Sequence, residues 1–196
     1  MPATFEQGHA LLIGVGSHRF HPGIDVPITV ADAKAVAEVL YDPTLCGYPK
    51  HQVQVLLNGS TTKAGILSAL KDLMQRVDEH DTGFLFYCGH GAFGTDGNYY
   101  LVSHDTQLQG GKVLAGTGVS EGELLEKLRA IKAKRMLMIF NACHSGSISP
   151  SLELEQETLT TSNPSEEARM ALLGTGKGRI IIVACRERQV SYIGNS

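Results

Sequence analysis

The sequence lacks three features that would each assign it to a particular class of protein. None of its apolar runs approaches the roughly 20 residues of a membrane-spanning helix, and its first residues lack the charged segment of a secretory signal. Lysine and arginine total 17 against 20 aspartate and glutamate residues, so no basic field favours nucleic acid or an anionic membrane. These absences predict a soluble cytoplasmic protein that binds neither nucleic acid nor membranes.

Cysteine is scarce, and its spacing is uninformative. The sequence has four cysteines, which are Cys46, Cys88, Cys143 and Cys185. They form no C-x-x-C pair, and three of them lie in or just after apolar runs, where thiols are usually buried and reduced. This favours a reducing compartment. No metal site is predicted, because His90, Cys143 and His144 have no recognised zinc-ligand spacing with a fourth partner.

The residues that are present suit one globular α/β domain. The chain has 196 residues, 42% hydrophobic and 19% charged, which is enough to bury a sizeable core. Short apolar runs alternate with segments in which apolar residues recur every three or four positions. The expected strands are 10–16, 53–58, 83–88, 135–142 and 179–185, with a short excursion at 98–103, and the expected helices are 26–42, 61–78 and 120–131. This alternation predicts a mostly parallel central sheet with helices on both faces.

Two of the expected strands end on a reactive side chain. His90 follows one strand in FLFYCGHGAFG, and Cys143 follows another in LMIFNACHSG. We expect them to meet, because the carboxyl ends of parallel strands share one edge of the sheet, where ligands bind. A nearby imidazole can accept the proton of a thiol, so the pair predicts a nucleophile and its base. The amides of Gly91 and Cys143 are candidate donors to the oxyanion.

FYCGHG and NACHSG resemble the two signature blocks of the caspase-homologous cysteine peptidases, in particular the metacaspases and their bacterial relatives. The resemblance extends along almost the whole chain, from ALLIGVG to RIIIVACRERQVSY. It implies a caspase-like three-layer α/β sandwich. It also implies His90 as general base and acid and Cys143 as nucleophile, with the amides of Gly91 and Cys143 as oxyanion donors.

The resemblance further implies a pocket for the substrate side chain before the scissile bond. Its residues would be Asp32, Asn141, Gln189 and Ser191. The acidic Asp32 predicts cleavage after arginine or lysine, although Asn141 stands where metacaspases usually carry a second aspartate, which weakens the pairing with a guanidinium. Arg186 and Arg188 lie close to the corresponding wall, so cleavage after aspartate is the alternative.

Asp32 also has an interpretation that needs no substrate. Thr29 and Asp32 have the S/T-x-x-D spacing of a capping box at the start of the helix expected over 26–42. Ser120 is predicted to be the N-cap of the helix over 120–131. The sequence leaves both interpretations of Asp32 open.

The polar segment 145–178 is long for a loop inside one domain, and a short helix at 164–173 is one option for it. The resemblance implies an activation segment that must be cut or displaced. The candidate autoprocessing sites are Arg169, Lys177 and Arg179. The sequence stops at SYIGNS, where this family usually continues into a strand and a helix, so we expect either a fragment or a partner chain that supplies the missing edge.

These observations predict a single peptidase domain over residues 1–196 that cleaves protein or peptide substrates through a thioester. No cofactor is expected to be required, and calcium dependence is left open because the acidic residues form no EF-hand-like run. The alternative is a catalytically silent domain of the same fold that acts as a scaffold or regulatory module, joined to a regulatory domain or partner chain.

Overall fold

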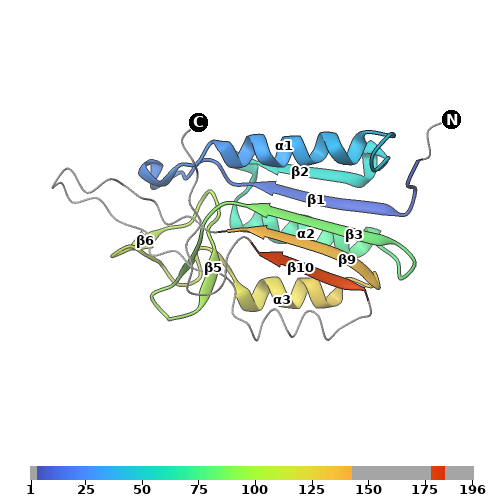
Figure 1. Cartoon of the computed structure of the whole chain (residues 1–196). Coiled ribbons are helices and arrows are strands. Elements are labelled where there is room, and N and C mark those ends of the chain that lie inside the picture. The colour runs from blue at the N-terminus through green and yellow to red at the C-terminus, as the bar shows by residue number, and fades with distance from the viewer. Residues whose placement is uncertain (1–3, 143–177, 184–196) are drawn as a thin grey trace.

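The computed structural model describes residues 4–142 and 178–183, and its centre is a five-stranded parallel sheet (Figure 1). The strands are β1 (Gly8–Gly14), β2 (Val53–Leu57), β3 (Thr82–Cys88), β9 (Arg135–Asn141) and β10 (Arg179–Val183). Their spatial order is β10-β9-β3-β1-β2, and every neighbouring pair is parallel. All five expected strands are therefore present, with ends that differ from the predicted ones by a residue or two.

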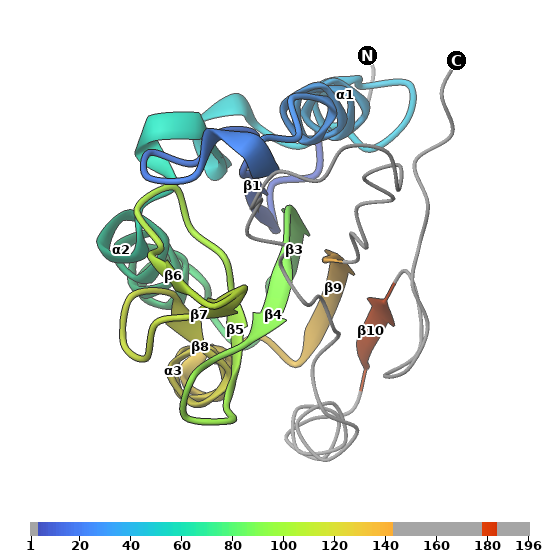
Figure 2. The ribbon, with the colours of Figure 1, turned by 90° about the vertical axis from the view of Figure 1, so that its left-hand side faces the viewer.

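In the described part of the chain, three α-helices cover the sheet on both sides, which confirms the predicted three-layer arrangement. They are α1 (Ile28–Tyr41), α2 (Lys63–Arg76) and α3 (Glu121–Ala130). Figure 2 shows α1 on one side of the sheet and α2 and α3 together on the other. None of these described helices is long and apolar enough to cross a membrane.

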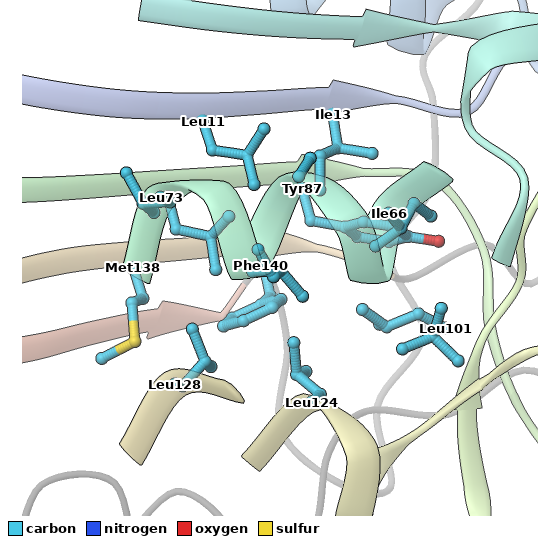
Figure 3. Packing of buried hydrophobic residues seen from close by; sticks show 14 of the residues in the cluster. Leu11, Ile13, Ile66, Leu73, Tyr87, Leu101, Leu124, Leu128, Met138 and Phe140 are labelled. Atoms are coloured by element: carbon cyan, nitrogen blue, oxygen red, sulfur yellow. The ribbon is translucent and has the colours of Figure 1, made fainter. Parts of the chain in front are cut away.

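The strands divide their side chains between the two layers, because successive residues of a strand point to opposite faces. In β3, Leu85 and Tyr87 join the cluster beneath α2 and α3, whereas Phe84, Phe86 and Cys88 join the cluster beneath α1. Figure 3 shows the first cluster, in which side chains of the sheet meet those of α2 and α3. Its labelled members are Leu11, Ile13, Ile66, Leu73, Tyr87, Leu101, Leu124, Leu128, Met138 and Phe140.

The helix starts confirm one capping prediction and correct another. Ser120 is the N-cap of α3 in a complete capping box with Glu123. The capping box predicted for Thr29 and Asp32 is wrong, because α1 has no side-chain cap and Thr29 Oγ1 donates to the Val26 carbonyl instead. Pro27 stands at the N-cap position, which puts Asp32 beyond the first turn, where the backbone N–H groups already have helical partners.

Several short strands lie beyond the carboxyl ends of the main sheet, where the sequence predicts one excursion at 98–103 (Figure 1). An antiparallel sheet contains β4 (Gly91–Phe93), β5 (Tyr99–Leu101) and β8 (Val119–Ser120), and a hairpin contains β6 (Leu108–Gln109) and β7 (Lys112–Val113). The hairpin turns on Gly110 and Gly111, both with positive φ. In Figure 2 these strands lie on the α2 and α3 side of the edge at which β3 ends.

The order of the strands marks that edge as the place for a site. The chain runs from β1 to β2 on one side and then returns to β3 on the other side of β1. Ligands of open α/β sheets bind outside the carboxyl ends of the strands at such a reversal. Figure 2 looks onto this edge.

Candidate active site

His90 lies two residues beyond the end of β3 and is 5% exposed. Its Nε2 is 2.7 Å from the backbone carbonyl oxygen of Ile24. Because a carbonyl oxygen only accepts hydrogen bonds, Nε2 must carry the hydrogen. In the neutral ring, Nδ1 is then the nitrogen with the lone pair, and it is the atom able to take up a proton.

The Ile24 carbonyl belongs to the segment between β1 and α1, which we call loop 15–27. The loop begins where the Val15 N–H donates to the Cys88 carbonyl of β3, at 2.9 Å. It is closed at its base by a hydrogen bond of 3.0 Å from the Val26 N–H to the Gly16 carbonyl. Within the loop, Pro22–Ile24 form a short 3₁₀ turn that ends at the residue whose carbonyl binds His90. The loop is thus fastened to the same strand end that carries His90.

The backbone of His90 is held from a second side. The Tyr87 hydroxyl is 2.7 Å from the His90 carbonyl oxygen and 3.0 Å from that of Val102, and the Val102 N–H also donates to the His90 carbonyl. Gly89 must be a glycine here, since a Cβ would lie 2.8 Å from the Tyr87 hydroxyl oxygen. Tyr87 is fully buried in the cluster beneath α2 and α3, so these contacts fix the backbone of His90 to the hydrophobic core.

Asp32 and Asn141, two of the predicted pocket residues, both contact the Cys88 thiol. The Cys88 Sγ donates to Asp32 Oδ2 at 3.6 Å and accepts from Asn141 Nδ2 at 3.4 Å. Burial, followed by the neighbouring Asp32 carboxylate, raises the pKa of the Cys88 thiol to about 12. Cys88 therefore stays protonated at neutral pH and is unsuited to be a nucleophile, as expected for a core thiol.

The Asp32 carboxylate is half-buried on α1. Within the described ranges 4–142 and 178–183, no lysine, arginine or histidine forms an ion pair with it. In the same part of the chain, no three histidine, cysteine or acidic side chains are grouped so that they could hold a metal ion. The one described donor to Asp32 is a thiol, which is a weak hydrogen-bond donor.

Arg179, a predicted autoprocessing site, has a different role in the structure. It is the first residue of β10 and is 7% exposed. Its guanidinium donates to the carbonyls of Leu128, Ile131 and Ala133, at and just beyond the end of α3, over 2.7 to 3.2 Å. Cleavage after Arg179 would require β10 to leave the sheet. The placement therefore argues against Arg179 as a processing site.

The other predicted residues lie outside the described ranges. They are Cys143, Arg169, Lys177, Gln189 and Ser191. The part of the site that the structure describes contains His90, Gly91, Asp32 and Asn141, and it adds Ile24 and Cys88, whose contacts with these residues the sequence analysis did not predict. A backbone carbonyl has no signature in the sequence, so Ile24 could not have been found there.

Comparisons with known proteins agree with this architecture. A profile of the caspase domain family, peptidase C14, matches residues 7–196. The crystal structure of protein GSU0716 from Geobacter sulfurreducens is similar with a TM-score of 0.55 and 22% sequence identity, over 72% of this chain and 52% of that chain. At this identity the likeness shows the fold alone, and the chain spans about half the length of that protein.

No curated protein matches the chain. The family profile covers nearly all of the sequence, including both blocks FYCGHG and NACHSG, and the three-layer sandwich agrees with it. The predicted family resemblance is thereby confirmed, and the chain belongs to the caspase domain family of peptidases.

Proposed function

We propose that this chain is a cysteine endopeptidase in which His90 and Cys143 form the catalytic dyad and that it cleaves after arginine or lysine. The observation that carries the proposal is the hydrogen bond from His90 Nε2 to the Ile24 carbonyl. It leaves Nδ1 as the basic nitrogen of a buried imidazole at the carboxyl edge of the sheet, which is the place and the protonation state that a general base needs.

The register of the sheet supports Cys143 as the partner of His90. Residues Cys88 of β3 and Asn141 of β9 are paired, and the Gly89 N–H donates to the Asn141 carbonyl at 3.1 Å. His90 and Cys143 each follow this pair by two residues. From this register we expect the two side chains to lie at the same edge of the sheet.

The proposed reaction has two stages. The Cys143 thiol gives its proton to His90 Nδ1, and its sulfur attacks the carbonyl carbon of the scissile peptide bond. The C–N bond then breaks, His90 returns the proton to the leaving amine, and a thioester remains. Water attacks the thioester with His90 again acting as base, which releases the acid product and restores the thiol.

Gly91 is the proposed donor to the oxyanion, together with the amide of Cys143. In the antiparallel pair of β4 and β5, the Val102 N–H donates to the His90 carbonyl, so Gly91 and Leu101 form a pair that exchanges no hydrogen bonds. The Gly91 N–H consequently points away from β5. A backbone donor beside the base, not used by its own sheet, suits the stabilisation of a tetrahedral intermediate.

The Asp32 carboxylate supports a basic side chain before the scissile bond. It lies half-buried with a weak thiol donor and, among the described residues, without a cationic partner. A lysine or arginine of the substrate would supply that positive charge. Asn141 reaches the same thiol and adds an amide in place of a second carboxylate, so Asp32 is the one carboxylate among the pocket residues that the structure describes.

Activation is proposed to involve cleavage or displacement of residues 145–178, with Arg169 or Lys177 as the processing point. Both are basic residues, of the kind that the Asp32 pocket would accept. Mass spectrometry of the active protein tests this directly. An enzyme that cleaves other substrates while its own chain stays intact would contradict autoprocessing.

The proposed function is tested with fluorogenic peptides that differ only in the residue before the scissile bond: Arg, Lys, Asp, Ala and Leu. The matched control is Cys143→Ala, which removes one sulfur atom from the protein. We expect hydrolysis after Arg and Lys that disappears in the variant. Cleavage after Asp would overturn the pocket and leave the dyad, whereas no cleavage and no labelling of Cys143 by a thiol-directed electrophile would favour a silent scaffold.

A further inference from the structure

Asp25 joins the two ends of loop 15–27 directly beside the carbonyl that holds His90. Its carboxylate Oδ1 accepts the His18 backbone N–H at 2.7 Å and lies 3.2 Å from His18 Nδ1. Asp25 directly follows Ile24 in the sequence, so the residue that binds His18 is adjacent to the carbonyl that binds His90. The orientation of that carbonyl depends on how the loop is closed at this point.

The His18 ring is 3% exposed and packs beside the catalytic histidine of the proposed dyad. The ring centroids of His18 and His90 are 5.4 Å apart, with their planes tilted by 39°. Because the Asp25 carboxylate accepts from Nδ1, the lone pair of His18 is on Nε2. In the described part of the chain, this Nε2 is buried and has no hydrogen-bond partner. A buried acceptor without a partner destabilises the fold, so stability alone does not account for a histidine here.

We propose that Asp25 and His18 form a positioning pair for His90. By closing loop 15–27, the pair holds the Ile24 carbonyl in line with His90 Nε2 and so maintains the tautomer in which Nδ1 is the base. The inference rests on the proposed function, since it concerns the same histidine. Neither residue touches the reacting atoms, and both act through the Ile24 carbonyl.

The charges around His18 agree with this role. The groups that face it are the Asp25 carboxylate and the imidazoles of His21, His90 and His104. Burial is the largest influence on the pKa of His18 and lowers it, although Asp25 acts in the opposite direction. His18 is therefore neutral at neutral pH. The positive charge that forms during the reaction then develops on His90 without repulsion from a charged neighbour.

The direct test observes the tautomer of His90 by NMR in protein labelled with 15N-histidine. The parent protein carries Cys143→Ala, so the measurement needs no activity, and the His90 signals are assigned by their loss in His90→Gln. We expect the Nε2–H tautomer in the parent and a mixture of both tautomers in Asp25→Ala. The control is Asp42→Ala, which removes another carboxylate that closes a local turn, at the far end of α1, and it should leave His90 unchanged.

Two substitutions at His18 separate the hydrogen bond from the ring. The amide nitrogen of His18→Asn lies close to the position of Nδ1 and can still donate to Asp25, whereas His18→Phe fills the space without a donor. We expect the His90 tautomer to be kept in His18→Asn and lost in His18→Phe. Should an alanine variant fail to fold, Asp25→Asn retains an oxygen acceptor and should retain the tautomer.

The second readout is turnover in the protein that has Cys143. Asp25→Ala should lower kcat by about 10- to 100-fold with KM within about twofold, because the base is misplaced and the substrate pocket is not. Asp42→Ala should match the wild type. A single His90 tautomer and an unchanged kcat in Asp25→Ala would overturn the positioning pair and leave the dyad intact. Absent peptidase activity with the expected tautomers would overturn the proposed function alone.

Discussion

The two faces of the central sheet differ most at its carboxyl edge. On the face beneath α2 and α3, apolar packing continues to the end of the strands, with Tyr87, Phe140 and Ala142 each no more than 2% exposed. On the face beneath α1, the buried cluster ends at Cys88, whose thiol contacts the polar side chains of Asp32 and Asn141.

This difference shows how one strand serves two purposes. Tyr87 and Cys88 are consecutive in β3, yet the first anchors the backbone of His90 in the core and the second contacts the proposed substrate pocket. We therefore expect substitutions beneath α2 and α3 to change stability, and substitutions at the carboxyl end beneath α1 to change activity.

The largest effect is expected from His90→Gln. The amide nitrogen of glutamine can still donate to the Ile24 carbonyl, but the side chain has no basic atom. We expect kcat to fall by about 10³-fold, while the melting temperature stays close to that of the wild type. The kinetics of hydrolysis after arginine and a thermal melt measure the two quantities. A variant that retained more than a tenth of the activity would remove His90 from its proposed role.

The matching test of the other face is Leu85→Ala, two residues before Tyr87 and 1% exposed. Loss of its side chain leaves a cavity beneath α2 and α3 and should lower the free energy of unfolding by about 2–5 kcal/mol. The folded fraction should keep the wild-type KM. Denaturant unfolding measures the loss. Val39→Ala, at an exposed position of α1, is the control and should cost less than about 0.5 kcal/mol.

Asp32→Asn should affect recognition. A charged hydrogen-bonded pair contributes about 1.5–3 kcal/mol, so kcat/KM for arginine substrates should fall by about 10- to 150-fold. Hydrolysis after alanine should change little, and the free energy of unfolding should change by less than about 1 kcal/mol. An equal loss for the arginine and alanine peptides would show that Asp32 supports the fold of the site and does not select the side chain.

The smallest expected effect is a pH dependence from His18. Burial lowers its pKa in the folded protein below the ordinary value of 6.5, so below pH 6.5 the unfolded chain binds more protons and the folded state loses stability. Wild type should therefore lose more stability than His18→Asn between pH 7.5 and 5.5, by up to about 1 kcal/mol. Urea unfolding at the two pH values measures it. Parallel losses in both proteins would assign the pH dependence to other groups.

Much of the fold follows from sequence patterns that are long enough to have a period. The five strands of the main sheet and the three helices each repeat their apolar residues several times, and all eight were predicted. The two-residue strands β6, β7 and β8 repeat nothing, so periodicity could not reveal them. The N-cap of α1 was misjudged because Thr29 and Asp32 fit a capping motif, whereas the N-cap is Pro27, two residues earlier.

The residues of the candidate site were likewise predictable only in part. His90 and Asp32 were identifiable because a histidine after a strand and an acidic residue in the first helix match a family pattern. Ile24 acts through its backbone, and the contact between His18 and Asp25 depends on how loop 15–27 closes. The hydrogen bonds of Arg179 were equally unpredictable, since its carbonyl partners at and beyond the end of α3 are far from it in the sequence.

The position of β10 has a consequence for the processing proposed above. The five residues of β10 pair with β9, and the Met136 N–H donates to the Gly178 carbonyl. The Arg179 guanidinium donates to three backbone carbonyls at and beyond the end of α3. A cut at Arg169 or Lys177 would divide the polypeptide upstream of all these contacts. The products would be two chains that migrate separately in denaturing gels and together in native ones.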